Sequence, residues 1–421
     1  MPWKETCPMK ERSRFVVEQE SGRYTMAELC RIFGISRETG YKWVARYEAG
    51  GPAGLADRSR APRRHPNAVT AEVEAVILET RAAYPTWGPE KLRAWLQEHR
   101  PGRRWPAGST IGDLLERHGL TVPRKKRRRA PPYTEPFAAC DGPNAVWCMD
   151  FKGWFRTGDG VRCDPLTISD AFSRYVLRCQ ALTDTRDETV RPLCEAAFRE
   201  FGLPWAIRTD NGSPFASRGI AGLSRLSVWW LRLGIVPERI EAGHPEQNGR
   251  HERMHRTLKA ETASPPARTV RGQQRVFDRW RVCFNEDRPH EALGERTPAW
   301  AYRPSPRPYP DRLPPVEYPA GLVVRVVQKR GEFYWLGHRV FLGEAFCHEP
   351  IGLEPLDGRY WLVYYATVAL GVFDAHRRRM LTAREAAKVT ADGRFGRPFR
   401  SAPGPAEPSP QNPKVSTMCP V

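Results

Sequence analysis

Three hydrophobic patterns follow one another along the chain. Up to about residue 122, apolar residues recur three or four positions apart, which is typical of amphipathic helices. Between residues 144 and 302, apolar runs of strand length alternate with helical stretches, and from 320 to 376 short apolar runs are separated by Gly-rich turns. The pattern predicts a multidomain protein with an all-α helix-turn-helix N-terminal region, an α/β core with a mixed sheet, and a small all-β barrel at the C-terminus.

Basic or Pro-rich stretches separate these parts and indicate the domain boundaries. The end of the chain is rich in Pro, Ser and Gly, a composition that disfavours a packed core. We expect a helix-turn-helix DNA-binding domain at 1–60, a second helical DNA-binding domain at 66–122, a basic and Pro-rich linker at 123–143, a core at 144–302, a small barrel at 320–376 and a disordered tail at 391–421.

A helix-turn-helix pattern lies near the start of the chain. Thr25 and Glu28 form a capping box that opens a short helix, and Ser36 caps a second helix after a turn at Gly34. The pattern resembles the helix-turn-helix heads of bacterial transposases, except that Gly40 replaces an apolar residue, which weakens the helix by about 1 kcal/mol relative to Ala. A plain helical hairpin is the alternative. If the pattern is a DNA-binding domain, the second helix presents five residues to DNA: Arg37, Glu38, Tyr41, Lys42 and Arg46.

A second helical cluster follows. Thr70 caps a helix that reaches Ala83, and Pro89 lies in the first turn of the next helix, where its missing N–H costs little. A third helix runs from about Ser109 to His118. We expect these helices to form a second DNA-binding unit; a connector without DNA contacts is the alternative.

The charge balance points to a polyanionic partner. Lys and Arg number 67 against 48 Asp and Glu, a formal net charge of +19. Such a field attracts nucleic acid. One basic run is expected to follow DNA phosphates rather than to serve only as a solvated linker: Arg124, Lys125, Lys126 and Arg127.

Membrane, secreted and zinc-finger proteins are disfavoured. The longest uncharged apolar stretch, Tyr360–Phe373, is too short to span a bilayer, and the first residues lack the apolar centre of a secretory signal. The 10 cysteines include no Cys-x-x-Cys pair. We therefore expect a cytoplasmic protein whose cysteines are reduced.

Acidic residues stand at the ends of two predicted strands and in one predicted helix of the core. Val146–Phe151 is predicted to be a strand that ends near Asp150, and Ala206–Asp210 a short strand followed by an Asn-Gly turn. A helix from about Asn248 carries Glu252. The predicted order of three strands, helix, strand, helix, strand and helix suits a mixed sheet flanked by helices.

The motifs around these acids resemble the three signatures of the integrase catalytic core: Trp147-x-x-Asp150, Thr209-Asp-Asn-Gly-Ser-x-Phe215 and Pro245-Glu-Gln-Asn-Gly-Arg-His-Glu252-Arg253. That core is shared by retroviral integrases and bacterial insertion-sequence transposases. A further block, Asn285-x-x-Arg-Pro-His-x-Ala-Leu293, is typical of the transposases. The resemblance implies a ribonuclease-H-like fold and a DDE site in which Asp150, Asp210 and Glu252 are catalytic residues and metal ligands.

Carboxylates suit the chemistry that the resemblance implies. Phosphodiester transfer is catalysed by two Mg²⁺ ions that clamp the attacking and leaving oxygens, and Mn²⁺ accepts the same oxygen ligands. The third acid has two candidates. A spacing common in the family selects Glu246, whereas the order of Pro245, Gly249 and Glu252 matches the motif, and we choose Glu252.

Other residues near the acids have more than one interpretation. His244 precedes the motif proline and either touches the scissile phosphate or is a loop histidine without a catalytic role. His251 and His255 have a spacing that can bind zinc, but we expect a surface or DNA-facing position. Lys152 and Asp170 receive no role.

Basic residues in the helix of Glu252 and in the C-terminal domain are further candidates for DNA contact. Arg256 and Lys259 would bind phosphate, with a solvated helix face as the alternative. Five short strands between Leu322 and Tyr365 predict the barrel, which carries several arginines. A structural or subunit-contact role is the alternative for that domain.

The combined features predict a DNA transposase. It would nick transposon ends in a metal-dependent reaction and transfer the 3′-OH into target DNA. We expect at least a dimer on DNA, because two ends must be held together, in a bacterial cytoplasm in association with the nucleoid. The alternatives are a catalytically inactive DNA-binding relative and a metal-dependent nuclease of the same fold.

Overall fold

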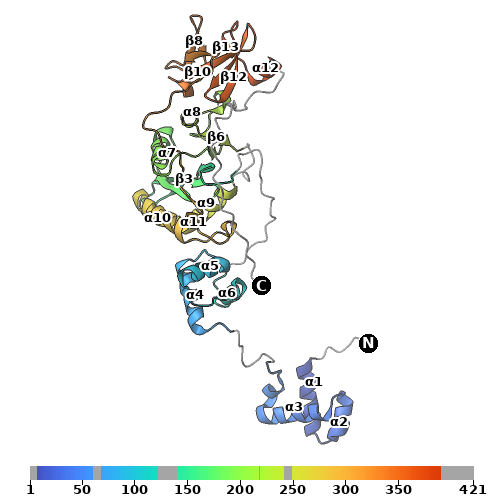
Figure 1. The fold of residues 1–421 in the computed structure, drawn as a ribbon. Coiled ribbons are helices and arrows are strands. Elements are labelled where there is room, and N and C mark those ends of the chain that lie inside the picture. The colour runs from blue at the N-terminus through green and yellow to red at the C-terminus, as the bar shows by residue number, and fades with distance from the viewer. Residues whose placement is uncertain (1–6, 60–67, 122–139, 218, 241–248, 390–421) are drawn as a thin grey trace, which may run out of the picture. The chain divides into compact units, whose positions relative to one another are not determined.

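The computed structural model describes residues 7–59, 68–121, 140–217, 219–240 and 249–389 (Figure 1). These residues form two compact units, one that ends at Thr70 and one that begins at Ala71. None of the helices in the described ranges is both long and apolar enough to cross a membrane. The basic run from Arg124 to Arg127 and the expected tail lie outside the described residues.

The first unit is a three-helix head. It consists of α1 (Pro8–Glu20), α2 (Met26–Phe33) and α3 (Arg37–Gly50), followed by the short 3-10 helix η1 (Gly51–Leu55). The expected capping box opens α2, and the Ser36 hydroxyl accepts a hydrogen bond from the N–H of Thr39 at the start of α3. The head therefore contains the predicted helix-turn-helix, and α1 adds a third helix that the sequence pattern did not predict. Its core consists of Phe15, Val16, Leu29, Cys30, Trp43, Val44 and Leu55.

Gly40 lies where the helices of the head approach most closely. It is buried in α3, and a Cβ added there would lie 2.6 Å from Cys30 Sγ, 3.0 Å from Phe15 Cζ and 3.1 Å from Met26 Sδ. The first of these distances is shorter than any ordinary carbon–sulfur contact. The glycine thus weakens the isolated helix but permits the packing of α3 against α1 and α2.

The second unit begins with three more helices. They are α4 (Ala71–Ala83), α5 (Pro89–His99) and α6 (Gly108–Arg117), close to the ranges expected from the sequence. Pro89 occupies the first turn of α5, as predicted. The buried side chains among these helices include Ile77, Trp87, Leu92, Leu96, Ile111, Leu114 and Leu115.

A six-stranded mixed sheet follows. The strands are β1 (Val146–Phe151), β2 (Phe155–Arg156), β3 (Arg162–Asp170), β4 (Val176–Leu182), β5 (Ala206–Thr209) and β6 (Val236–Arg239). Their order is β2-β3-β1-β5-β6, with β4 also paired to β3. The pairs β1–β3, β2–β3 and β3–β4 are antiparallel, whereas β1–β5 and β5–β6 are parallel. The predicted mixed sheet is therefore confirmed.

Helices cover both faces of this sheet. On one face, α7 (Asp187–Phe201) and α8 (Arg225–Arg232) pack against Trp147 and Met149 of β1. On the other face, α9 (Gly249–Thr262) and α10 (Val270–Val282) pack against residues of β3 and β4. A π-helical turn (Cys283–Asp287), a 3-10 turn (Glu291–Leu293) and α11 (Pro298–Ala301) complete the core. Alternate residues of one strand therefore contact different helical layers.

The C-terminal part is all-β and forms a half-barrel. Its five-stranded antiparallel sheet has the order β13-β12-β11-β10-β7, and β8 pairs with β9 in a separate hairpin. These strands are β7 (Val323–Val326), β8 (Glu332–Trp335), β9 (His338–Phe341), β10 (Pro350–Pro355), β11 (Tyr360–Tyr365), β12 (Val368–Asp374) and β13 (Arg379–Met380). A 3-10 turn (Glu344–Phe346) lies within this part, and the helix α12 (Ala383–Val389) follows β13. The sequence predicted five strands here and missed β12 and β13.

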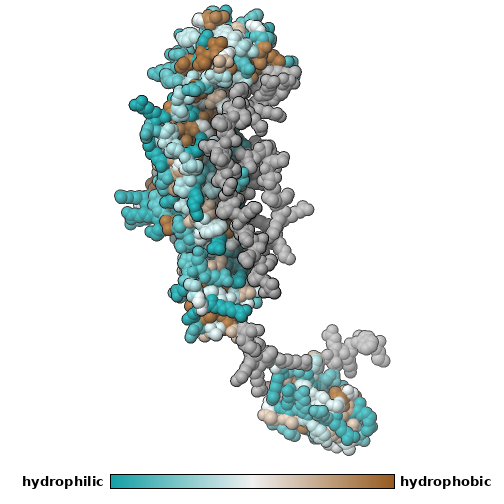
Figure 2. Space-filling model, in the orientation of Figure 1, coloured by the Kyte–Doolittle hydropathy of each residue, from teal (hydrophilic) through white to brown (hydrophobic). Residues whose placement is uncertain are grey.

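Apolar contacts join this half-barrel to the core. Val228 and Leu231 of α8 share one buried cluster with residues of the sheet. Arg232 also pairs with Glu349 at 3.1 Å, and the same carboxylate accepts a hydrogen bond from the hydroxyl of Tyr365. On the face drawn in Figure 2, hydrophilic residues predominate over the core and apolar residues gather over the half-barrel.

Replacing Gly40 by Ala is expected to destabilise the head by up to about 2 kcal/mol, because overpacking of a buried contact costs about 1–3 kcal/mol and the gain in helix propensity returns only about 1 kcal/mol. Hydrogen exchange of α3 peptides, measured by mass spectrometry on the full chain, should therefore become faster. Gly50→Ala is the matched control, because nothing lies within 4 Å of a Cβ at that position. Slower exchange in Gly40→Ala than in the wild type would contradict the packing argument.

Candidate active site

The register of two parallel strands brings Asp150 and Asp210 to one edge of the sheet. Cys148 of β1 lies opposite Arg208 of β5. Asp150 follows the first residue of this pair by two positions and Asp210 follows the second by two. Because adjacent parallel strands point their carboxyl ends the same way, both acids lie at the same end of the sheet. This is the type of edge at which α/β sheets form their sites.

The turn after β5 is shaped around the Asp210 carboxylate. Asp210 Oδ1 accepts a hydrogen bond from the N–H of Gly212 at 3.0 Å. The side-chain amide of Asn211 donates to the carbonyl of Ile240 at 2.6 Å, which ties the turn to the segment after β6. A Cβ on Gly212 would lie only 3.1 Å from Asp210 Oδ2, so glycine lets the carboxylate fold back over the turn.

Glu252 comes from the first turn of α9 and is exposed. Arg256 and Lys259 follow it by four and seven positions and are also exposed, so all three lie on one face of the helix. The opposite face carries Met254 and Leu258, which pack into the buried cluster with α10. The two faces of α9 therefore have separate roles, one in packing and one beside the acids.

The charges of the three acids act on one another. Burial and the negative charges of Asp210 and Glu252 together raise the pKa of Asp150 to about 7, while Lys152 acts in the opposite direction. A carboxylate whose pKa is raised by other carboxylates lies where positive charge is lacking. Oxygen donors with excess negative charge suit a hard divalent cation such as Mg²⁺. The residues present therefore fit a metal site.

His251 and His255 are buried, and the expectation that they face solvent or DNA is wrong. Their exposed fractions are 2% and 4%. Hydroxyl groups on β3 account for this position: Thr167 Oγ1 lies 2.8 Å from His251 Nε2 and 2.6 Å from His255 Nε2, and Ser169 Oγ lies 2.9 Å from His251 Nδ1. Polar partners inside the core allow the two rings to be buried on the packing face of α9.

The two histidines and Asp150 could also be considered as a metal site, since one ligand atom from each lies within 4.8 Å of the others. However, both ring nitrogens of His251 already have a hydroxyl partner. Burial lowers the pKa of His251 to about 3 and strongly lowers that of His255, so both rings are neutral. Neutral rings can bind a metal, but the hydroxyl partners of His251 occupy both of its nitrogens, so we assign the pair a structural role.

Thr167 and Ser169 are the site residues that sequence reasoning missed. They occupy alternate positions of β3, a strand whose residues after Arg162 are all buried. A buried strand that carries hydroxyls at positions i and i+2 on one face requires polar partners across that face. This signal was present in the sequence, but its partners lie more than 80 residues away.

Several other predicted residues have structural partners or lie outside the described ranges. Asp170 is buried and accepts hydrogen bonds from the backbone of Asn144 and from the backbone and hydroxyl of Ser173, so it stabilises the turn after β3. His244 and Glu246 are not among the described residues.

The block around Asn285 supports the core. The side chain of Asn285 accepts a hydrogen bond from the N–H of Val176 at 2.8 Å and donates to its carbonyl at 3.0 Å. Arg288 pairs with Glu261 of α9 at 2.7 Å. These contacts hold the end of α10 against β4 and α9, so the block contributes to the position of the helix that carries Glu252.

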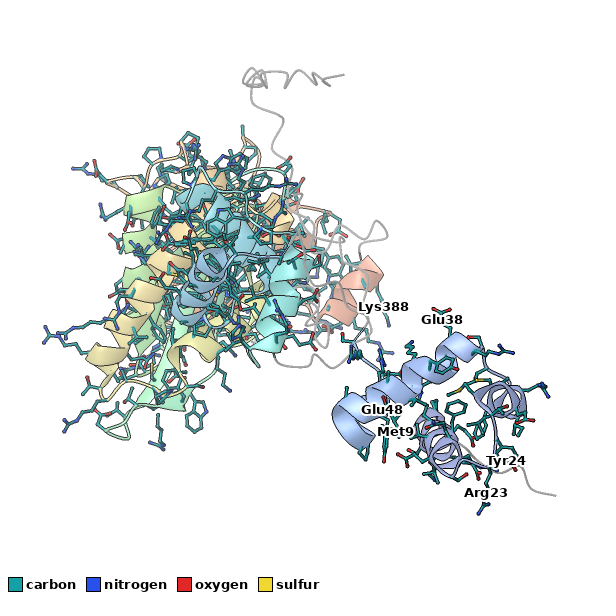
Figure 3. All side chains as sticks on the ribbon, turned by 90° about the horizontal axis from the view of Figure 1, so that it is seen from below. Met9, Arg23, Tyr24, Glu38, Glu48 and Lys388 are labelled. Atoms are coloured by element: carbon teal, nitrogen blue, oxygen red, sulfur yellow. The ribbon has the colours of Figure 1, made fainter. Side chains whose placement is uncertain are left out.

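In the head, the predicted DNA-contact residues lie on α3. Arg37, Glu38, Tyr41 and Lys42 are exposed, and Glu38 points outward from α3 (Figure 3). Lys42 Nζ also lies 5.2 Å from the centre of the Trp43 ring. Arg46 is half-buried, and its guanidinium lies 4.9 Å from the same ring centre. It therefore also contributes to packing.

Comparisons with known proteins agree with this architecture. Residues 14–63 match a helix-turn-helix domain and residues 39–115 a homeodomain-like domain. Residues 141–245 and 233–298 match the integrase core domain.

Relatives of the chain occur in bacterial insertion elements. It is 28% identical over 276 residues to a 31.7 kDa protein of insertion element IS407 from Burkholderia multivorans, covering 64% of this chain and 87% of that protein. It is 30% identical over 251 residues to a 39.2 kDa protein of insertion element IS476 from Xanthomonas euvesicatoria, covering 58% and 69%. Among solved structures, the HTLV-2 integrase catalytic core aligns with 16% identity and a TM-score of 0.31, covering 39% of this chain and 99% of that chain.

Without divalent cations, Asp150→Asn is expected to stabilise the core at pH 8 by roughly 2–4 kcal/mol. The folded state retains the Asp150 proton up to about pH 7, whereas the unfolded chain loses it near pH 4, so wild-type stability falls as the pH rises through this window. The Asn side chain does not titrate in this range, so the gain in stability from Asp150→Asn should disappear at pH 4.

Urea unfolding in EDTA, followed by hydrogen exchange of β1 peptides, measures this difference. Asp113→Asn, which alters an exposed aspartate of α6, is the control and should show no such pH dependence. An equal effect of Asp150→Asn at pH 4 and pH 8 would contradict the electrostatic explanation.

Proposed function

Because the chain belongs to the insertion-element proteins that carry an integrase core domain, we propose that it is a DNA transposase. In this proposal it nicks the ends of a mobile element and joins the freed 3′-OH to target DNA. The observation that carries the proposal is the convergence of three carboxylates, in which the charges of Asp210 and Glu252 raise the pKa of Asp150.

We propose that Asp150, Asp210 and Glu252 hold the catalytic metal. When bound there, two Mg²⁺ ions would stabilise negative charge on the attacking and leaving oxygens of the scissile phosphate. The protein's own contribution is to hold the carboxylates on rigid elements: Asp150 at the end of β1, Asp210 in the turn after β5, and Glu252 in the first turn of α9. Mn²⁺ accepts the same oxygen ligands and is expected to substitute.

Other residues are proposed to position the DNA. Arg256 and Lys259 lie on the same face of α9 as Glu252. Their positively charged side chains would contact the DNA phosphates that flank the scissile phosphate. The exposed residues of α3 would bind the terminal inverted repeats, and the helices α4, α5 and α6 would make additional contacts with DNA. Arg124, Lys125, Lys126 and Arg127 would contribute charge between these units and the core.

The reaction joins both ends of one element to target DNA, so each end must be held beside the other. We therefore propose at least a dimer on DNA. The proposed location is the bacterial cytoplasm, together with the chromosome that supplies both substrates.

Asp150→Asn, Asp210→Asn and Glu252→Gln are each expected to reduce metal-dependent strand transfer by at least about a thousandfold, because each removes a charged metal ligand. DNA binding should stay close to that of the wild type. The measurement is a strand-transfer assay with labelled element ends, with a gel-shift assay for binding.

Glu246→Gln is the control for the choice of the third acid and should remain active. Loss of activity in Glu246→Gln together with full activity in Glu252→Gln would contradict the assignment. Products that arise only by hydrolysis would indicate a nuclease, and DNA binding without any Mg²⁺- or Mn²⁺-dependent product would indicate an inactive relative.

Arg256→Ala and Lys259→Ala are each expected to weaken DNA binding for all sequences and to reduce the slope of log K against log salt by about one. The reason is that each variant loses one phosphate contact. Fluorescence anisotropy at several salt concentrations measures the slope. Arg199→Ala, on α7 on the other face of the sheet, is the control. An equal reduction of the salt-dependence slope in that variant would contradict the proposal that DNA lies along α9.

A further inference from the structure

A continuous row of buried polar contacts runs from β3 through α9 to Asp150. Ser169 Oγ lies 2.9 Å from His251 Nδ1, and His251 Nε2 lies 2.8 Å from Thr167 Oγ1. Thr167 Oγ1 in turn lies 2.6 Å from His255 Nε2. His255 Nδ1 faces Asp150 Oδ2 at 3.7 Å, which is longer than a hydrogen bond but close enough for electrostatic attraction.

The number of hydrogens limits how this row can be arranged. A hydroxyl group has one hydrogen, and a neutral imidazole has one N–H. If Ser169 donates to His251 Nδ1, then His251 donates from Nε2 to Thr167, Thr167 donates to His255 Nε2, and His255 carries its proton on Nδ1. Each contact then has one donor and one acceptor, and the N–H at the end of the row points at the Asp150 carboxylate.

Two other arrangements are possible on the same atoms, and both are disfavoured by Asp150. In the first, every hydrogen bond is reversed. In the second, Thr167 donates to the carbonyl of Asp150, which lies 3.2 Å away, and both histidines donate to Thr167. Each of these places the proton of His255 on Nε2, so that a nitrogen lone pair faces the negative carboxylate.

Only the arrangement in which His255 carries its proton on Nδ1 gives Asp150 a favourable neighbour on the side of the histidines. Asp150 is mostly buried and lies close to two other acids, whose charges oppose its ionisation. A metal ligand must be ionised, so a fixed N–H directed at Oδ2 assists metal binding and sets the direction of the carboxylate.

We propose that Ser169, His251, Thr167 and His255 form a directed hydrogen-bond relay that positions Asp150 for metal binding, with His255 in the Nδ1–H tautomer and His251 in the Nε2–H tautomer. The four are positioning residues, since none of them is assigned a contact with DNA or metal. The same contacts hold α9 against β3, next to the strand of Asp150, and so also position Glu252. This inference rests on the proposed metal site.

The tautomers can be measured directly, without DNA or metal. The full chain is labelled with ¹⁵N-histidine, and two-dimensional NMR at pH 8.5 in EDTA identifies the protonated nitrogen of each ring. His251→Gln and His255→Gln assign the signals. The relay requires Nδ1–H at His255 and Nε2–H at His251, and a proton on Nε2 of His255 would overturn it.

Variants of the central hydroxyl test the effect on the metal. Thr167→Val removes the hydroxyl and keeps the shape, and Thr167→Ser keeps the hydroxyl. Mn²⁺ binding to the full chain without DNA, followed by electron paramagnetic resonance of the free ion, should weaken about 10–100-fold in Thr167→Val and remain within about threefold of the wild type in Thr167→Ser.

Thr262→Val is the matched control, because Thr262 is also buried and its hydroxyl donates to the backbone of the same helix, α9, at the carbonyl of Leu258. Mn²⁺ binding in Thr167→Val that is as tight as in Thr262→Val would overturn the proposal. If Thr167→Val does not fold, the tautomers of the wild-type chain decide the question. A chain that has the required tautomers and binds Mn²⁺ but forms no strand-transfer product would contradict only the proposed transposase activity.

Discussion

The parallel pairing of β1 with β5 is the constraint on which the candidate site depends. Backbone hydrogen bonds set the register at Cys148 and Arg208, and this register alone brings together two carboxylates that are 60 residues apart in the chain. The arrangement is unfavourable for an isolated protein, because burial and neighbouring negative charge raise the pKa of Asp150 to about 7. The surrounding strands must therefore hold the acids in place against their mutual repulsion, and a bound cation would relieve it.

The helix α9 serves this arrangement with both of its faces. Its buried face carries His251 and His255, whose ring nitrogens are satisfied by hydroxyls of β3, so the helix has a defined rotation relative to the sheet. That rotation determines where the exposed face, with Glu252, is presented. Contacts of Arg288 with Glu261 hold the far end of the same helix. Polar groups inside the core thus fix the orientation of α9, in addition to the apolar packing around Met254 and Leu258.

The sequence predicted the order of the elements and the strand-end acids well, because both follow from local patterns. Capping residues such as Thr25 and Ser36 mark helix starts through bonds within one turn, and these helices begin where expected.

The burial of His251 and His255 could not be predicted in the same way, since it depends on hydroxyls of a distant strand. Gly40 was interpreted only by its helix propensity, whereas its position is explained by the close approach of Cys30 and Phe15. The strand β12 was missed because the apolar run that begins at Tyr360 continues into it without a recognised turn, and β13 was missed because its two residues, Arg379 and Met380, are too few to form a pattern. Local rules describe single elements, and these exceptions arise where elements meet.

The most direct test of the account is to locate a divalent cation relative to the acids. Crystals of the chain soaked with Mn²⁺ give anomalous diffraction that places the ion without reference to any assumed mechanism. The account predicts a peak about 2.0–2.3 Å from carboxylate oxygens of both Asp150 and Asp210, with Glu252 on the same side. A peak on the nitrogens of His251 and His255, or acids too far apart to share an ion, would contradict it.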